Sequence, residues 1–341
     1  MTIVVIDRAC EQAALRHQAQ LTKPAGALGR LEEVAVWFAA RQGKVNPERL
    51  RPHIAVFAGD HGVCAEGVSA FPSVVTGEMV KNFSRGGAAI NVLARQCGAS
   101  LSVIDVGVAS ELPALHGVVA AKVAAGTNNL LTGPAMTVEQ CAAAIEVGRR
   151  AVAAAIADGA NLLIAGDMGI GNTTASACLI CRFTEAAPRN VVGRGTGIDD
   201  AAHRRKVAVV AQALARIEGC PDGEVLAEVG GLEIAAMAGF YLEAAGQGVP
   251  AVVDGFIAAA AALAAKQIEP AVADWLLASH VSQENGHAIA LASLGLSPMI
   301  DLCMRLGEGS GAALIVPLLN SAIALHNEMA TFASAGVSEK G

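Results

Sequence analysis

Short apolar runs alternate along most of the chain with alanine-rich stretches whose apolar residues recur at helical spacing. Each run is rich in Val, Ile, Leu and Ala, and each ends in a glycine or a polar residue. This alternation indicates strands and helices of an α/β protein with a mostly parallel sheet. We therefore predict strands at residues 53–58, 101–106, 161–165, 249–253 and 275–278.

The two ends of the chain differ from its middle. They read as helices rather than as alternating units, with a loop at residues 22–30 near the start. We predict a Rossmann-like large α/β domain at residues 50–290, in which helices flank the sheet. A small, mainly helical domain is predicted from both termini, residues 1–49 and 291–341.

Composition narrows the class of protein. Hydrophobic residues make up 53% of the 341 residues but aromatic residues only 3%, so alanine accounts for much of the mean hydropathy of +0.48. Small aliphatic side chains suit helices that pack on a parallel sheet. The uncharged stretch at 309–325 is interrupted by Pro317 and Asn320 and is shorter than the roughly 20 residues of a bilayer span. We expect no transmembrane helix and no membrane partner.

Charge and cysteine content point to a cytoplasmic protein that does not bind nucleic acid. The net charge is −7, and the sequence contains no basic block. The start of the chain lacks the basic and apolar regions of a secretion signal, and the eight cysteines form no disulfide-like framework. The single CxxC pair, Cys178 and Cys181, lies in an apolar run, where we expect buried core residues rather than a metal or redox site.

Polar or glycine-rich turns follow the predicted strands. They contain Asp60 and His61 after the first strand, residues 166–174 after the third, Asp254 after the fourth and residues 279–287 after the fifth. The carboxyl ends of parallel strands lie at one edge of an open sheet, and ligands bind at that edge. We therefore expect these turns to form one crevice.

One of these turns is a candidate phosphate site. Gly169 and Gly171 lie between a predicted strand and a helix that begins near Asn172 and Thr173. In this context the free backbone N–H groups of a helix start bind phosphate. The turn matches neither a Walker loop nor the full dinucleotide fingerprint, which favours a monophosphate. The alternative is that the glycines serve close packing only.

A second glycine turn contains Gly195 and precedes a predicted helix that carries Lys206. A lysine on this helix can contact a phosphate as a mobile positive charge. The alternative is an ordinary helix face that points to solvent.

Glu308 is the candidate catalytic base. It lies between Gly307 and Gly309, immediately before an apolar helix that Ser310 can cap. The glycines permit a sharp turn and a close approach to a ligand, and the free N–H groups of the helix start favour an ionised carboxylate. Such a group can accept a proton. The alternative is that Glu308 only ends one element and caps the next.

Four polar residues at the strand ends raise the possibility of a metal site. Asp60, His61, Asp254 and His280 are residue types that a metal-dependent phosphatase or nucleotide hydrolase would use. No HExxH or other ligand spacing connects them, so hydrogen bonding that shapes the crevice is the more economical role. We expect neither a metal nor a cofactor. A hydrolase and a non-catalytic nucleotide sensor remain alternatives.

In combination, six stretches between residues 21 and 319 closely resemble the nicotinate-nucleotide:dimethylbenzimidazole phosphoribosyltransferase family of cobalamin nucleotide-loop assembly. They are KPxGxLGRLE at 23–32, FAGDHGV at 57–63, GDMGIGNTT at 166–174, GRGTG at 193–197, DGF at 254–256 and RLGEGSGAAL at 305–314. The resemblance covers nearly the whole chain. It implies transfer of the phosphoribosyl group of nicotinate mononucleotide to 5,6-dimethylbenzimidazole with inversion at C1′, giving α-ribazole 5′-phosphate and nicotinate. It also implies a homodimer.

The resemblance further assigns residues. Glu308 is implied as the general base, and Asp167 matches a position, usually Glu in the family, that is associated with catalysis or ribose binding. Glu78 lies in the implied benzimidazole pocket where we expect Gln, so an acid there is predicted to change which base is accepted. The substrate-binding residues implied in this way or expected from the turns are Gly169, Gly171, Asn172, Thr173, Lys206, Gly195, Ser282, Ser69, Phe71, Glu78, Asp60 and His61.

Overall fold

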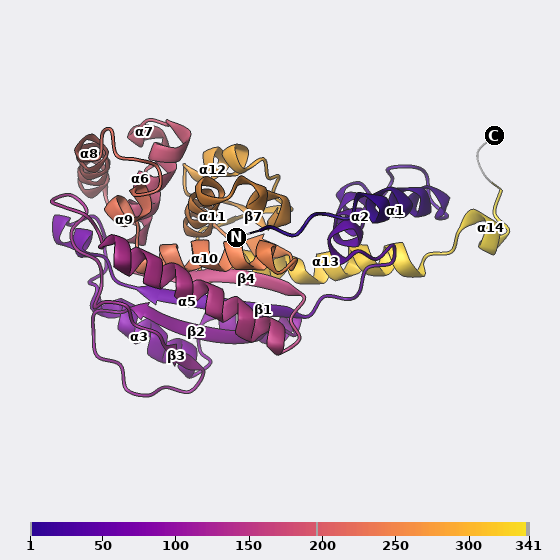
Figure 1. Cartoon of the computed structure of the whole chain (residues 1–341), viewed down its shortest axis with the longest axis horizontal. Helices are drawn as coiled ribbons and strands as arrows, with labels where there is room; N and C mark the ends of the chain where they lie inside the picture. The colour runs from indigo at the N-terminus through magenta and orange to yellow at the C-terminus, as the bar shows by residue number, and fades with distance from the viewer. Residues whose placement is uncertain (1, 196, 339–341) are drawn as a thin grey trace.

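A six-stranded parallel sheet lies at the centre of the protein in a computed structural model that describes residues 2–195 and 197–338 (Figure 1). The strand order is β3-β2-β1-β4-β5-β6, so the chain reverses direction across the sheet between β1 and β4. All five predicted strands are confirmed. The strands are β1 Pro52–Gly59, β2 Ser100–Gly107, β3 Val118–Ala120, β4 Leu162–Met168, β5 Ala251–Val253 and β6 Leu276–Ala278.

A second, two-stranded parallel sheet joins β7, His280–Ser282, to β8, Ile300–Met304. The chain after residue 291 is mostly helical, as predicted, but it also contains β8, which the sequence does not mark. This strand is short and largely exposed, so it carries no continuous buried run that would mark it. Its pairing with β7, about twenty residues earlier, decides its conformation.

Helices cover both faces of the central sheet, and strand side chains alternate between the two layers. Ala55 and Phe57 of β1 belong to one apolar cluster, whereas Ile54, Val56 and Ala58 belong to the other. The first cluster includes α5 Val138–Ala157, α6 Asn172–Thr184, α8 Asp200–Arg216, α9 Val225–Val229, α10 Leu232–Gly246, α11 Phe256–Ile268 and α12 His287–Leu294. The second includes α2 Arg30–Gln42, α3 Val74–Ser84, α4 Ala89–Cys97 and α13 Ser310–Glu328. The remaining helices are α1 Arg8–Gln20, η1 Gly62–Glu66, α7 Pro188–Val191, η2 Pro270–Trp275 and α14 Phe332–Ala335.

The apolar helix predicted after Glu308 is confirmed as α13, and it continues through Pro317 and Asn320. Pro317 removes its own backbone donor, while Ile315, Val316 and Leu319 anchor the helix in the apolar core. Among the described helices, α13 alone is long and apolar enough to cross a membrane by length and composition. However, 56% of that span is buried inside the protein, as in a core helix.

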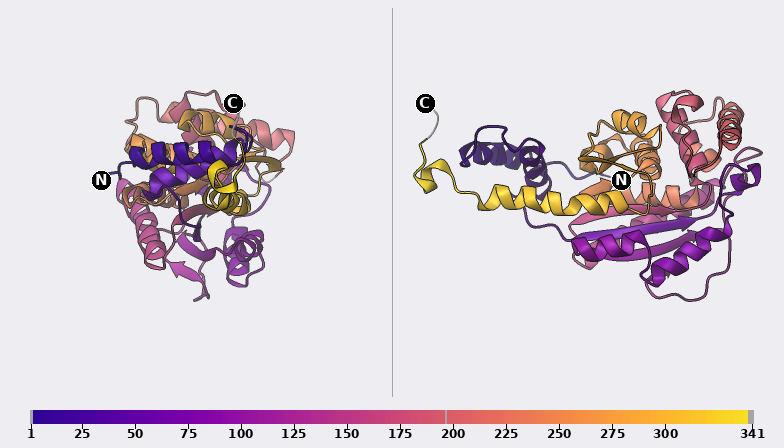
Figure 2. Two further views of the ribbon diagram at one scale, coloured as in Figure 1. Left: turned by 90° about the vertical axis from the view of Figure 1, so that its right-hand side faces the viewer. Right: turned by 180° about the vertical axis from the view of Figure 1, so that it is seen from behind.

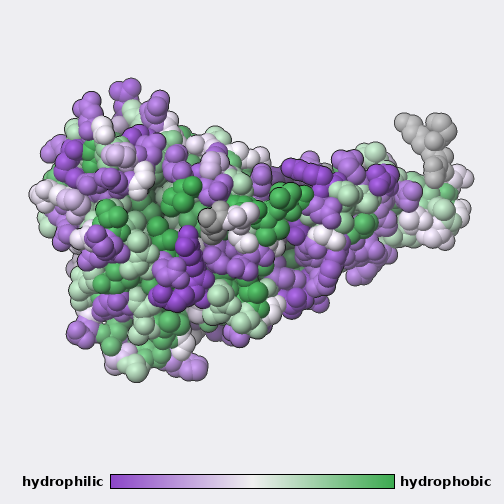
Figure 3. Space-filling view, in the orientation of Figure 1, coloured by the Kyte–Doolittle hydropathy of each residue, from purple (hydrophilic) through white to green (hydrophobic). Residues whose placement is uncertain are grey.

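The terminal helices extend the molecule to one side of the sheet. Figure 2 shows α1, α2 and the far half of α13 side by side, away from the strands. Figure 3 shows the same region as a narrow extension of a broader body. The predicted N-terminal helices and the loop at 22–30 are confirmed. The division into domains at 50–290, 1–49 and 291–341 stays a prediction.

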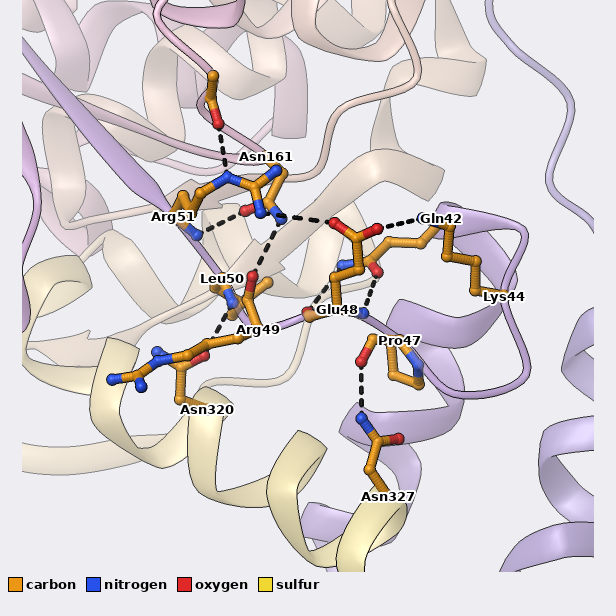
Figure 4. Close-up of polar contacts among 11 residues, drawn as sticks. Gln42, Lys44, Pro47, Glu48, Arg49, Leu50, Arg51, Asn161, Asn320 and Asn327 are labelled. Atoms are coloured by element: carbon orange, nitrogen blue, oxygen red, sulfur yellow. Dashed lines mark hydrogen bonds and ion pairs between the residues drawn. The ribbon is translucent and has the colours of Figure 1, made fainter.

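Side-chain amides hold the segment that leads from α2 into β1 (Figure 4). Asn320 of α13 accepts the backbone N–H of Leu50 at 2.9 Å, and Asn327 donates to the carbonyl of Pro47 at 2.8 Å. On the other side, Asn161 accepts the N–H of Arg51 at 2.6 Å. These bonds tie the linker to both α13 and the strand β4 region, so they fix the position of the terminal helices relative to the sheet.

Candidate active site

A cavity of about 670 Å³ opens at the carboxyl ends of β4, β5 and β6 and continues to β7. It lies beside the point where the strand order reverses, which is where α/β sheets bind ligands. The position is that of the predicted crevice. The predicted site residues that line it are Phe71, Asp167, Gly169, Asn172, Thr173, Gly195, Ser282 and Glu308.

Glu308 occupies a left-handed backbone conformation, with φ of +64°, between Gly307 at +85° and Gly309 at +82°. Three consecutive residues of this kind make a sharp turn, and the one that is not glycine carries backbone strain. The turn lies directly on β4, because a methyl group at Gly166 would overlap the carbonyl of Glu308. Gly166 therefore lets the loop approach the strand closely enough to deliver this carboxylate.

The carboxylate of Glu308 is almost fully buried and lines the cavity. Its Oε2 atom accepts the backbone N–H of Ile90, in the first turn of α4, at 3.3 Å. Burial raises its pKa above the ordinary value of 4.5. The arrangement leaves Oε1 without a hydrogen-bond partner among the described residues.

Asp254, rather than Ser310 or Glu308, caps the helix that follows. Its two carboxylate oxygens accept the N–H groups of Gly309 at 3.2 Å and Ala312 at 2.9 Å. The predicted cap by Ser310 is wrong, because its hydroxyl instead donates to the carbonyl of Gly307 at 2.6 Å. Burial raises the pKa of Asp254 to about 7. The alternative that Glu308 caps α13 is wrong as well, since Asp254 fills that place.

Asp167, at the end of β4, lies against the Glu308 turn. It accepts a hydrogen bond from the side chain of Asn172 at 2.9 Å, and a methyl group at Gly307 would lie 3.1 Å from both of its oxygens. Burial, together with the negative charges of Asp254, Glu233 and Glu308, raises the pKa of Asp167 well above its ordinary value. Burial and these neighbouring charges therefore favour the neutral form of the Asp167 carboxyl.

The two glycines of the predicted phosphate turn differ in their position. Gly171 is the N-cap of α6 with φ of +97° and is not among the residues that line the cavity, and at Gly169 a methyl group would overlap the carbonyl of Gly59. Gly169 is thus required for packing and also lines the cavity. Asn172 and Thr173, in the first turn of α6, expose the positive end of the helix to the same space.

Lys206 of α8 is buried behind this turn. The residue is 1% exposed, and its Nζ donates to the Thr173 hydroxyl at 2.7 Å. Burial lowers the pKa of Lys206 to about 8. The alternative of a solvent-facing lysine is therefore wrong. Its amino group does not line the cavity itself and lies one side chain behind the wall formed by Thr173 and Gly195.

Two cavity residues that the sequence patterns do not mark hold the second glycine turn. Glu284 accepts the N–H of Gly195 at 2.9 Å, and Arg305 donates to the carbonyl of the same residue at 3.0 Å. Glu284 lies in the tract at 279–287 and Arg305 in the tract at 305–314, and no feature of the neighbouring sequence assigns a role to either residue. Thr196, which belongs to the GRGTG stretch, lies outside the described residues.

Several predicted residues do not line the cavity. Ser69 is half-buried, and Glu78 is exposed on α3. The residues that line the cavity here are Phe71, which precedes α3, and Val75 and Met79, which lie four positions apart on α3. Helical spacing is the signal that would have found Val75 and Met79.

Asp60 and His61 lie behind the wall of the cavity. Asp60 accepts the N–H of Ala109 at 2.8 Å, and His61 pairs with Glu233 at 2.6 Å, both side chains of that pair being fully buried. His280 does line the cavity, at 3.9 Å from Asp254. Within residues 2–195 and 197–338, no group of three or more His, Cys, Asp or Glu side chains is arranged to hold a metal ion.

The CxxC pair is part of the core, as predicted. Cys178 and Cys181 are buried on α6, 0% and 3% exposed. Burial raises the pKa of the Cys181 thiol to about 12 and that of Cys178 further. Thiols held protonated in this way do not act as redox or metal-binding groups at neutral pH.

Comparison with known proteins agrees with the resemblance. A phosphoribosyltransferase family model matches residues 3–337. A nicotinate-nucleotide-dimethylbenzimidazole phosphoribosyltransferase from Chromobacterium violaceum is 61% identical over 337 residues, which cover 98% of both chains. The chain belongs to this phosphoribosyltransferase family. A relative of the same name from Pseudomonas aeruginosa is 52% identical and is matched over 96% of its length.

Solved structures share the fold of this phosphoribosyltransferase. The nicotinate-nucleotide-dimethylbenzimidazole phosphoribosyltransferase of Thermus thermophilus superposes with a TM-score of 0.94 at 50% identity, covering 98% of this chain and 100% of that one. A structure of CobT from the same organism gives a TM-score of 0.95 at 51% identity, with coverage of 97% and 100%. The α/β fold and the membership of a transferase family are thereby established.

Proposed function

We propose that the enzyme transfers the phosphoribosyl group of nicotinate mononucleotide to 5,6-dimethylbenzimidazole or a related base, with inversion at C1′. The products are α-ribazole 5′-phosphate and nicotinate, in the assembly of the lower ligand of cobalamin. The relatives named above support the substrates. The observation that carries the mechanism is one buried carboxylate, Glu308, in the wall of a cavity that also contains the start of α6.

The leaving group needs no acid. In nicotinate mononucleotide the ring is a pyridinium, and breaking the bond from C1′ to its nitrogen returns the bonding electrons to that nitrogen and neutralises its charge. A nitrogen of the benzimidazole forms the new bond from the opposite face of C1′, which converts the β configuration to α. The reaction therefore requires that the protein position the two substrates and provide one proton acceptor.

Glu308 is the proposed acceptor. When one benzimidazole nitrogen attacks, the azole becomes cationic and the N–H at its other nitrogen becomes acidic. Glu308 takes that proton through the oxygen that is not bonded to Ile90. Its raised pKa brings it closer to neutrality and makes it a stronger base than an ordinary carboxylate. A positioned base of this kind contributes roughly 10²- to 10⁴-fold to the rate.

The rest of the cavity divides between the two substrates. The phosphate is proposed to bind at Gly169, Asn172 and Thr173, where the first turn of α6 carries partial positive charge and Lys206 adds a full one behind it. The flat apolar base suits the side lined by Phe71 and its neighbours on α3. Asp167, which lines the cavity beside the Glu308 turn, is proposed to contact the ribose between them. Ser282, also in the wall, offers a hydroxyl to the phosphate.

We also propose that the protein is a homodimer and that it is cytoplasmic. Both termini are proposed to form a small domain. Four leucines that are 36–58% exposed support the dimer: Leu302 on β8, Leu306 in the cavity wall, and Leu314 and Leu318 on α13. A surface of this kind is typical of subunit interfaces. Sedimentation of Leu318→Asp should show a monomer where the unaltered protein is a dimer; an unaltered protein that is already monomeric refutes this part.

The test of the function is nicotinate release from nicotinate mononucleotide, with and without 5,6-dimethylbenzimidazole, in a buffer that contains a chelator. Release that requires the base and yields an α-ribotide supports the proposal. Release without the base indicates a hydrolase instead, and loss of activity in the chelator points to the metal-dependent alternative. Absence of any release refutes nicotinate mononucleotide as the donor.

A further inference from the structure

His280 is held rigidly in the cavity wall and has no role in the mechanism above. It is the first residue of β7, is 3% exposed and lines the cavity. The backbone of α13 lies directly against its ring, because a methyl group at Gly311 would overlap the imidazole. This close packing restricts the ring, and its hydrogen bonds determine which nitrogen carries the hydrogen.

The hydroxyl of Ser279 determines the tautomer. It donates its single proton to the carbonyl of Asp254 at 3.0 Å. The same oxygen lies 2.9 Å from Nδ1 of His280, so in that contact it must accept and Nδ1 must carry the hydrogen. Burial lowers the pKa of His280 and so favours the neutral ring. The other nitrogen, Nε2, consequently carries a lone pair and no hydrogen.

Nε2 is an acceptor without a partner among the described residues. It lies beside Gly255, where a methyl group would be 3.8 Å away, and Gly255 lines the same cavity. Nε2 has no partner in the described part of the chain, yet it is not one of the fully buried atoms, so part of its surface is accessible from the cavity. A substrate group that pairs with Nε2 must therefore be a hydrogen-bond donor.

Few groups of the two substrates can do so. The phosphate and the carboxylate of nicotinate mononucleotide are ionised and only accept, so a lone pair repels them. The benzimidazole N–H is the proton that Glu308 removes. The ribose hydroxyls are the donors that remain. We propose that Nε2 of His280 accepts a hydrogen bond from a ribose hydroxyl of the donor nucleotide and selects ribonucleotides over deoxyribonucleotides. This inference rests on the proposed function.

The test compares nicotinate mononucleotide with its 2′-deoxy and 3′-deoxy analogues, as kcat/KM for base-dependent nicotinate release and as Kd. The unaltered enzyme should disfavour one analogue by about tenfold or more, since a buried acceptor is then left unpaired. His280→Leu should lower kcat/KM for the ribonucleotide by about tenfold and leave that analogue nearly unchanged, so that the discrimination disappears. His280→Gln, whose amide oxygen can replace Nε2 as acceptor, should restore most of it.

A buried histidine elsewhere provides the matched control. His53 bonds to Ser100 and Ser102 at the start of β1, the end of the strand opposite the cavity. His53→Gln should keep full discrimination. Equal losses for the ribonucleotide and both deoxy analogues in His280→Leu would overturn the inference while the transferase function stands. Indifference of the unaltered enzyme to both hydroxyls would overturn it without any variant, and absence of base-dependent release would overturn the function together with it.

Discussion

Replacing Glu308 with glutamine exchanges one carboxylate oxygen for an NH₂ group and leaves the volume of the side chain almost unchanged. In the native side chain, Oε2 accepts the N–H of Ile90 at 3.3 Å. The amide oxygen introduced by Glu308→Gln would keep that bond only in the orientation that turns the NH₂ group toward the cavity. The variant therefore presents a donor where the attacking base needs an acceptor, and it cannot take up a proton.

The expected loss follows from that change. General base catalysis contributes about 10²- to 10⁴-fold, which corresponds to about 3–5 kcal/mol of activation free energy. The loss should appear in kcat, whereas the Kd of nicotinate mononucleotide should stay within about threefold, because the phosphate is proposed to bind at the start of α6, away from Glu308. The assay is nicotinate release at saturating substrates, with nucleotide binding measured separately by calorimetry.

The pH dependence provides a second measurement on the same variant. The base must be ionised to act, and burial raises the pKa of Glu308 above 4.5. Activity of the unaltered enzyme should therefore fall as the pH decreases through that raised pKa, and the residual activity of Glu308→Gln should lack this acid limb. Glu33→Gln, an exposed carboxylate on α2, is the matched control. Near-normal turnover of Glu308→Gln would remove Glu308 from the role of base.

Three further changes probe the surroundings. Lys206→Met keeps the length of the side chain and removes its buried charge, so KM for nicotinate mononucleotide should rise at least about tenfold while the melting temperature does not fall; an unchanged KM would exclude a role in phosphate binding. Gly166→Ala places a methyl group against the Glu308 carbonyl and should cost about 1–3 kcal/mol in thermal unfolding together with turnover, and full activity with an unchanged melting temperature would contradict the close approach. Phe71→Ala should weaken binding of 5,6-dimethylbenzimidazole, whereas Glu78→Gln should leave the preference among competing bases unchanged because Glu78 is exposed and does not line the cavity; a shift in that preference would show that Glu78 reaches the bound base.

The sequence by itself determined the parts of this protein that depend on neighbouring residues. The long strands β1 and β4 were predictable because they are buried on both faces and therefore consist mostly of apolar residues, and the buried second half of β2 was predictable from its β-branched residues. The turn at Glu308 was predictable because glycine on both sides marks a left-handed backbone. The edge of the sheet at which the site lies was predictable too, because parallel strands place the polar turns that follow them at the same edge.

Only the tertiary structure decided which side chains share a space. A lysine on an amphipathic helix has the same local pattern whether it faces solvent or, like Lys206, is buried against Thr173. Asp254 caps α13 from more than fifty residues away, so no local motif identifies it. Glu78 lies in the implied base pocket by sequence but is exposed and does not line the cavity. Short strands such as β8 depend in the same way on a distant partner, because pairing and burial are properties of contacts between segments rather than of either segment alone.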